Sequence, residues 1–164
     1  MQVYVVGESL ASRGMLLLLG TAPYSLSVRQ VPEPDEVARH LAGPERRVVV
    51  ICLSAHPEAL AAVAQCLEAA AEQPGVLVIT SAQTPAATLL AYVRPGWGFV
   101  HCGSSVEVLQ RGIEAVAAGR WFADPVMGDA LIAALAQRQH EHARASPNPG
   151  HRAPGMPRRR CAIN

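Results

Sequence analysis

The order of apolar segments along this chain constrains its fold more than any other feature. Short apolar runs alternate with stretches in which apolar residues recur every three to four positions, as on one face of a helix. The runs predict strands at 2–6, 24–31, from Val48 to Cys52, 75–80 and 97–101. The stretches predict helices at 9–19, 33–42, 58–73, 86–93, from Val106 to a stop at Gly119, and from Asp124 to Ala145. Such alternation favours an α/β protein with a doubly wound parallel sheet and helices on both faces.

The length of the chain bounds its domain organisation. A chain of 164 residues is long enough for one domain with a full core and too short for two ordinary ones. We expect one α/β domain over 1–120, a C-terminal linker helix over 121–145 and a tail over 146–164. The tail is rich in Pro, Gly and Arg and has no hydrophobic periodicity, so we predict that it is disordered.

Composition excludes several kinds of chemistry. All 14 basic residues are arginine, which removes mechanisms that need a lysine, such as P-loop phosphate binding or a Schiff base. The four cysteines are far apart with no C-x-x-C pair, so we expect free thiols and no zinc site. Without a long apolar window or a signal-peptide pattern, a soluble, cytoplasmic protein with no membrane span is expected. The arginines near the C-terminus have no interleaved aromatics, so no direct nucleic-acid binding is expected.

Small and polar residues follow the predicted strands, at the edge where open parallel sheets place their ligands. Gly7 and Glu8 follow the first strand, Cys52 ends the third, Thr80 ends the fourth and Cys102 follows the fifth. No aspartate is expected at the end of any strand. We expect Cys52 to fill space as a small hydrophobe, since no neighbouring cation in the sequence favours its thiolate, with redox sensing or modification as the alternative.

Three segments resemble the receiver domain of bacterial response regulators, in the branch that carries a LuxR-type DNA-binding domain. The most specific is "GFVHCGSSVEVLQRGIEAVAAGRWFADPVMGDALIAAL" (98–135), which looks like the fifth strand, the last receiver helix and the start of the linker helix. "VVGESLASRGML" (5–16) and "VLVITS" (76–81) are similar to the family's first and fourth strands. The resemblance implies a flavodoxin-like (βα)5 sheet with strand order 2-1-3-4-5 and an extra C-terminal helix. The DNA-binding domain is expected to be missing, so that the chain is either a stand-alone module or truncated within the linker.

The resemblance also implies a degenerate phosphorylation pocket. The family uses a pair of acids, a phospho-accepting aspartate, a Thr/Ser, a lysine and a switch aromatic. The matching residues here are Gly7 and Glu8, Cys52 (or Leu53 by the proline spacing), Thr80, Cys102 and Phe99. One glutamate is too few for a Mg²⁺ site, and neither a carboxylate nucleophile nor a lysine is present. We therefore expect no metal, no cofactor, no aspartyl phosphorylation and no enzymatic activity.

The expected function is that of an atypical receiver domain, acting in signal transduction or transcriptional regulation through protein contacts. In the family, the fourth helix, fifth strand and fifth helix make the usual dimer or partner surface, so a homodimer or a regulatory protein partner is expected there. The candidate interface residues are Leu89, Tyr92, Trp97, Val106, Leu109 and Trp121. The alternative is a pseudo-receiver that senses a small ligand in the emptied phosphorylation pocket.

Two other motifs are each incomplete. "GESLA" (7–11) imitates the G-x-S-x-[GA] elbow of hydrolases, but no acid and histidine are expected at the later strand ends that a catalytic triad needs. The ending "PRRRCAIN" has the outline of a prenylation signal, although Asn is a poor last residue for one. Neither motif displaces the prediction of a regulatory module.

Overall fold

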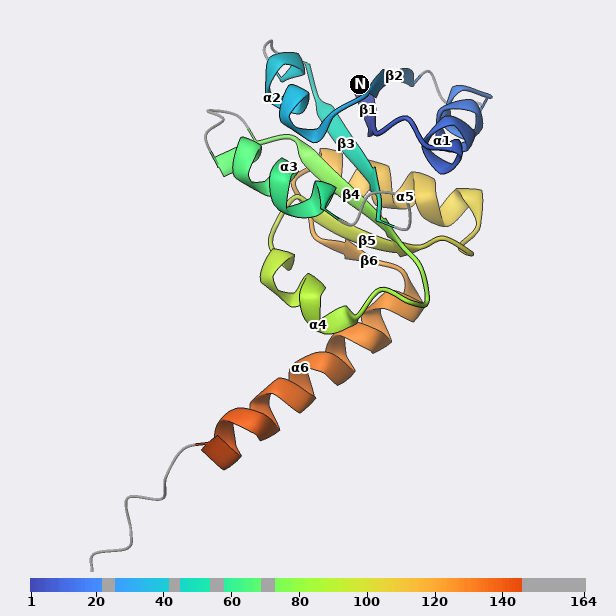
Figure 1. The fold of residues 1–164 in the computed structure, drawn as a ribbon. Helices are drawn as coiled ribbons and strands as arrows, with labels where there is room; N and C mark the ends of the chain where they lie inside the picture. The colour runs from blue at the N-terminus through green and yellow to red at the C-terminus, as the bar shows by residue number, and fades with distance from the viewer. Residues whose placement is uncertain (22–25, 42–44, 54–57, 69–72, 146–164) are drawn as a thin grey trace, which may run out of the picture.

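A computed structural model describes residues 1–21, 26–41, 45–53, 58–68 and 73–145 of the chain (Figure 1). The strands are β1 (Gln2–Val6), β2 (Ser27–Val31), β3 (Arg47–Cys52), β4 (Gly75–Thr80), β5 (Trp97–His101) and β6 (Phe122–Ala123). The α-helices are α1 (Leu10–Thr21), α2 (Val37–His40), α3 (Ala59–Glu68), α4 (Ala86–Leu89), α5 (Val106–Ala117) and α6 (Pro125–Ala145). Two 3-10 turns, η1 (Pro34–Glu36) and η2 (Leu90–Tyr92), adjoin α2 and α4. The predicted tail and the segment 54–57 lie outside the described residues.

The strands form one parallel sheet in the order β2-β1-β3-β4-β5-β6. The predicted α/β class and parallel sheet are confirmed, and the arrangement is compatible with a flavodoxin-like fold. The sheet differs from the predicted five-strand order by β6, whose Phe122 pairs with Gly98 and whose Ala123 pairs with Phe99. The predicted start of the last helix at Asp124 is confirmed, since α6 begins at Pro125, and residues 122–123 of the segment 121–145 form β6 before it.

The two faces of the sheet bury separate apolar clusters, because successive side chains of a strand point to opposite faces. On β3, Val49 and Ile51 join a cluster with residues of α2, α3, α4 and α6. Val50 and Cys52 join a second cluster with residues of α1 and α5. Every residue of β3 and β4 is buried, which explains their nearly continuous apolar sequence.

The helices on the first face are shorter than the periodicity predicts. The segment expected to be one helix over 33–42 forms η1 followed by the single turn of α2. The segment expected to be helical over 86–93 forms the single turn of α4 and then η2. A short amphipathic stretch can bury its apolar side either as an α-helix or as a 3-10 helix. Tertiary packing therefore decides which of these two helix types forms.

The first part of α6 belongs to the domain and its last part does not. Met127 and Leu131 are buried in the first cluster, and α6 packs against α4, η2 and β5. From Leu135 to Arg144 every side chain of α6 is exposed, and Figure 1 shows this part of α6 projecting away from the sheet. None of the described helices is long and apolar enough to cross a membrane.

Candidate functional site

The register of the sheet brings the predicted site residues to one edge. Val6 pairs with Ile51, so Gly7 lies beside Cys52 at the ends of β1 and β3. Cys52 pairs with Ile79, and Thr80 pairs with His101. The residues that follow β1, β3, β4 and β5 therefore lie side by side at the carboxyl edge, where ligands of open α/β sheets bind.

Cys52 is part of the core. Its side chain is 3% exposed and packs among apolar residues that include Val50, Ile79 and Leu109. Burial raises the pKa of the Cys52 thiol to about 11, so the thiol is protonated at neutral pH and is a poor nucleophile. Leu53, the other position at this strand end, is also buried and packs on the opposite face. Neither position offers a phosphoryl acceptor.

Gly7 makes the turn from β1 into α1. Its φ of 95° lies in the left-handed region that glycine tolerates and other residues rarely adopt. Its amide donates to the carbonyl of Val31 at 2.8 Å, and its carbonyl accepts from the Gln30 side chain at 2.9 Å. The hydroxyl of Ser9 accepts from the amide of Ser12 at 3.1 Å and so caps the N-terminus of α1. Glu8 lies between them and is exposed to solvent.

Thr80 is engaged by α6 and does not face open solvent. Its side chain is fully buried, and its hydroxyl lies 3.0 Å from the sulfur of Met127 and 3.3 Å from the carbonyl of Val100. Phe99, the predicted switch aromatic, is also fully buried in the cluster that holds Met127. The hydroxyl at this strand end therefore joins the sheet to α6.

Cys102, like Glu8, is exposed to solvent. It is a free cysteine at the surface, and its amide donates to the carbonyl of Thr80 at 2.8 Å. The neighbouring His101 accepts a hydrogen bond from the amide of Gly103 through Nδ1 at 3.1 Å. That bond holds the imidazole over the turn that follows β5.

Asp124 is the residue at this edge that sequence reasoning missed. It directly follows β6 and is 1% exposed, so the expectation that no aspartate ends a strand is wrong. Its carboxylate accepts from the amide of His101 at 2.6 Å, from the hydroxyl of Ser104, and from the amide of Met127 at 2.7 Å. The last bond is an N-cap of α6, as "DP" before an apolar stripe predicts. With three donors in place, the carboxylate connects β5, the turn after it and α6.

Within the described ranges, no group of three or more His, Cys, Asp or Glu side chains could hold a metal ion. A pocket of about 440 Å³ opens beside Leu53 and Ser81, between α3 and α4. Its described lining combines apolar Leu60 and Tyr92 with the neutral polar side chains of Ser81, Gln83, Thr84 and Thr88, and neither Cys52 nor Cys102 belongs to it.

Three of the predicted interface residues are inside the domain. Leu89 is fully buried, Trp97 is 2% exposed and Leu109 is 4% exposed. The prediction that they anchor a surface contact is therefore wrong for this chain. Leu89 and Trp97 lie in the first cluster, where α6 packs against α4 and β5 and covers part of the surface on which the prediction placed the partner. Leu109 is buried in the second cluster, on the opposite face of the sheet.

The other three predicted interface residues keep some exposure. Tyr92 is half-buried and stacks on Trp97 with 5.5 Å between ring centroids, and Val106 is also half-buried. Trp121, which precedes β6, is 45% exposed. Along α6, Val126, Ile132 and Leu135 are 57%, 69% and 49% exposed.

Comparison with known proteins adds no further assignment. No protein-family model matches the chain, and no curated protein or solved structure matches it either. The site is therefore interpreted from its own residues.

Proposed function

We propose that the chain is a receiver-like regulatory module that works through protein contacts and without aspartyl phosphorylation or enzymatic turnover. The observation that carries the proposal is the connection between the carboxyl edge of the sheet and α6. Thr80 and Asp124 contact α6 through Met127, by the hydroxyl–sulfur contact of 3.0 Å and the N-cap of 2.7 Å. Cys52, in contrast, is sealed in the core. Because the residues at the carboxyl edge of the sheet contact α6, they support a role for this edge in holding α6 in place.

The outer side of α6 is the surface that the proposal assigns to a partner. Ile132 is four residues after Gly128 and three before Leu135, a spacing that puts all three on one side of the helix. Ile132 and Leu135 are both largely exposed, and an exposed apolar stripe on a helix is a common mark of an interaction site. A second copy of the chain is the partner that we propose, with the two α6 helices in contact.

Two measurements test the proposal. Incubation with acetyl phosphate and Mg²⁺, followed by intact-mass analysis, is expected to show no gain of a phosphoryl group, and a gain would refute it. Light scattering during size-exclusion chromatography is expected to show a dimer that Ile132→Arg converts to a monomer. The matched control is Ala133→Arg, an exposed neighbour off the stripe, which is expected to leave the dimer intact. A monomeric wild-type chain contradicts the dimer, and equal effects of the two variants contradict the stripe of Ile132 and Leu135 as its interface.

The pocket between α3 and α4 supports a second candidate, a module that senses a small neutral ligand. No charged side chain belongs to the described lining of this pocket, and its volume of about 440 Å³ lies in the range of small-molecule sites. α4 is a single turn with this pocket on one side and α6 on the other, and Thr88 lines the space on both sides. Ligand sensing predicts that nicotinamide raises the unfolding temperature and that the anion nicotinate does not, because the lining holds no cation.

A further inference from the structure

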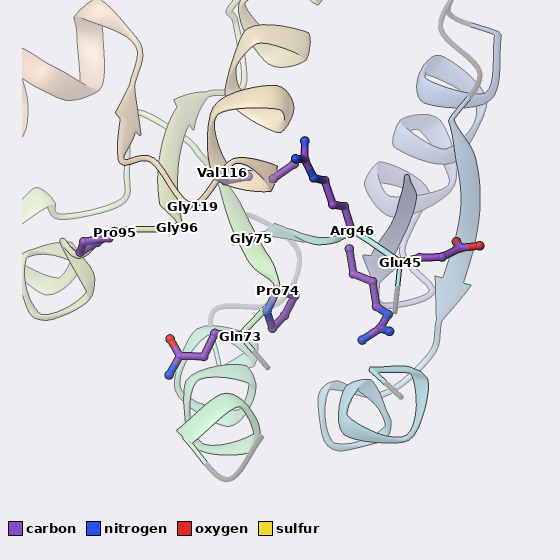
Figure 2. Close-up of a pocket in the computed structure, with 11 residues that line it drawn as sticks. Glu45, Arg46, Gln73, Pro74, Gly75, Pro95, Gly96, Val116 and Gly119 are labelled. Atoms are coloured by element: carbon purple, nitrogen blue, oxygen red, sulfur yellow. The ribbon is translucent and has the colours of Figure 1, made fainter. Parts of the chain in front are cut away.

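A second pocket lies at the opposite edge of the sheet, where β3, β4 and β5 begin. Its volume is about 520 Å³, and the residues around it come from the segments before these strands and from the end of α5. Figure 2 shows Pro74 and Gly75 entering β4, Pro95 and Gly96 before β5, and Arg46 entering β3 around the same space. No residue of the carboxyl edge contributes to it, so it is separate from the site described above.

The pocket lining includes a buried arginine, Arg47, for which the described residues supply no ion pair. Arg47 is only 7% exposed. One nitrogen of its guanidinium, Nη1, donates to the carbonyl of Leu41, and the other, Nη2, has no hydrogen-bond partner. Among the residues that the structure describes, the one ion pair is Arg39 with Glu36, so no carboxylate pairs with Arg47. A buried charge without a partner is strongly unfavourable, which makes an anion in this pocket stabilising.

A second arginine nitrogen without a hydrogen-bond partner belongs to the residue that precedes Pro95 of the pocket lining. Nε of Arg94 is buried and has no hydrogen-bond partner, and the residue after it, Pro95, lines the pocket. The guanidinium of Arg94 lies over the ring of Trp97, 4.7 Å from its centroid. Within the described ranges, the buried side-chain nitrogens or oxygens without a partner are these two, Nη2 of Arg47 and Nε of Arg94. Unsatisfied buried donors are rare, and of these two Nη2 of Arg47 belongs to a residue of the pocket lining.

Two features of the lining are unfavourable for an anion: the carboxylate of Glu45 and the carbonyls at the end of α5. Glu45 lines the pocket, but it is exposed. The C-terminal end of α5 also faces it, and free carbonyls there would repel an anion. The carbonyls of Ala115 and Val116 are already bonded, because they accept from the amides of Arg120 and Gly119 at 2.9 Å each. These hydrogen bonds therefore weaken the repulsion between the two carbonyls and a bound anion.

We propose that this pocket binds a small oxyanion, the phosphate or carboxylate group of a metabolite, with Arg47 as the buried anchor and Arg46 as a second cation at the mouth. The planar guanidinium presents paired donors that fit two oxygens of either group. The proposal does not depend on the regulatory function proposed above.

The test compares thermal unfolding of the full chain with and without inorganic phosphate, with NaCl added to hold ionic strength constant. Citrate in a second series distinguishes carboxylate from phosphate. Wild type is expected to gain about 5–10 °C at one hundred times the dissociation constant. Arg29→Met, which removes an exposed arginine of β2, is the matched control and is expected to gain as much.

Arg47→Met is expected to lose the gain from phosphate and, without any anion, to unfold at a temperature equal to or above that of wild type, because the variant buries no unpaired charge. If wild type does not respond to phosphate or citrate, or if Arg47→Met responds as wild type does, the proposal is overturned. It is also overturned if Arg47→Met and Glu45→Gln are equally destabilised without an anion, since a carboxylate of the chain is then the partner. Should Arg47→Met not fold, the ³¹P signal of phosphate is measured with wild type and with Arg46→Met. Broadening by wild type and not by Arg46→Met supports the proposal, and equal broadening by both, or by neither, overturns it.

Discussion

Replacing Asp124 by alanine tests the connection between β5 and α6 most directly. The substitution removes an acceptor that is 1% exposed and holds three donors. Loss of an N-cap costs about 1 kcal/mol, and each hydrogen bond to a charged group contributes about 1.5–3 kcal/mol. With the lower value for the bonds from His101 and Ser104, the free energy of unfolding is expected to fall by about 4 kcal/mol. This loss is a large part of the about 5–15 kcal/mol that is usual for a domain.

Urea unfolding measures this loss by tryptophan fluorescence and by far-ultraviolet circular dichroism. Asp129→Ala is the matched control, because Asp129 is an exposed carboxylate on the same helix and its removal is expected to change stability by about 0.5 kcal/mol or less. Asp124→Asn is expected to fall between the two, since asparagine caps a helix but carries no charge. If Asp124→Ala and Asp129→Ala lie within about 1 kcal/mol of each other, the three bonds do not hold α6 in place.

Three further outcomes follow from the packing. The pKa of Cys52 is raised from 9.0 to about 11, so the folded state holds a proton that the unfolded state releases, and stability falls as pH rises from 9 to 11. The fall is at most about 1.4 kcal/mol per pH unit, and Cys52→Ala is expected to abolish it in urea titrations at successive pH values. In native protein, iodoacetamide is expected to modify the exposed Cys102 well before Cys52, and peptide mass mapping that finds Cys52 modified first would contradict its burial. A β-carbon on Gly75 would stand 2.5 Å from the carbonyl of Val116, so Gly75→Ala is expected to cost more than about 3 kcal/mol, whereas Gly14→Ala in open space on α1 is expected to stabilise by about 0.5–1 kcal/mol in the same assay.

The carboxyl edge could be predicted from the sequence because β-strands alternate faces and parallel strands end together. The apolar runs located the five long strands, so Gly7, Cys52, Thr80 and Cys102 could be assigned to one edge before any coordinates. The burial of Cys52 also follows from its apolar neighbours. What each side chain does at that edge could not be predicted, because the contact of Thr80 is with Met127, which is 47 residues later in the chain.

The features that the sequence concealed depend on long-range packing. β6 has two residues, too few for any periodicity, and exists because β5 offers it an edge. With β6 in place, Asp124 becomes a strand-end residue. Leu89 and Trp97, in turn, are removed from the surface where α6 packs on α4 and β5.

Periodicity and composition alone therefore determined the α/β class, the long strands and the absence of lysine-dependent chemistry, since each of these is a property of neighbouring residues or of a count. The position of α6, the hydrogen bonds that join Asp124 to His101 and Ser104, and the surroundings of the Arg47 guanidinium were decided only by the tertiary structure. Hydrogen bonds and buried charges are satisfied between segments far apart in the chain, and no local pattern records which segment arrives to satisfy them.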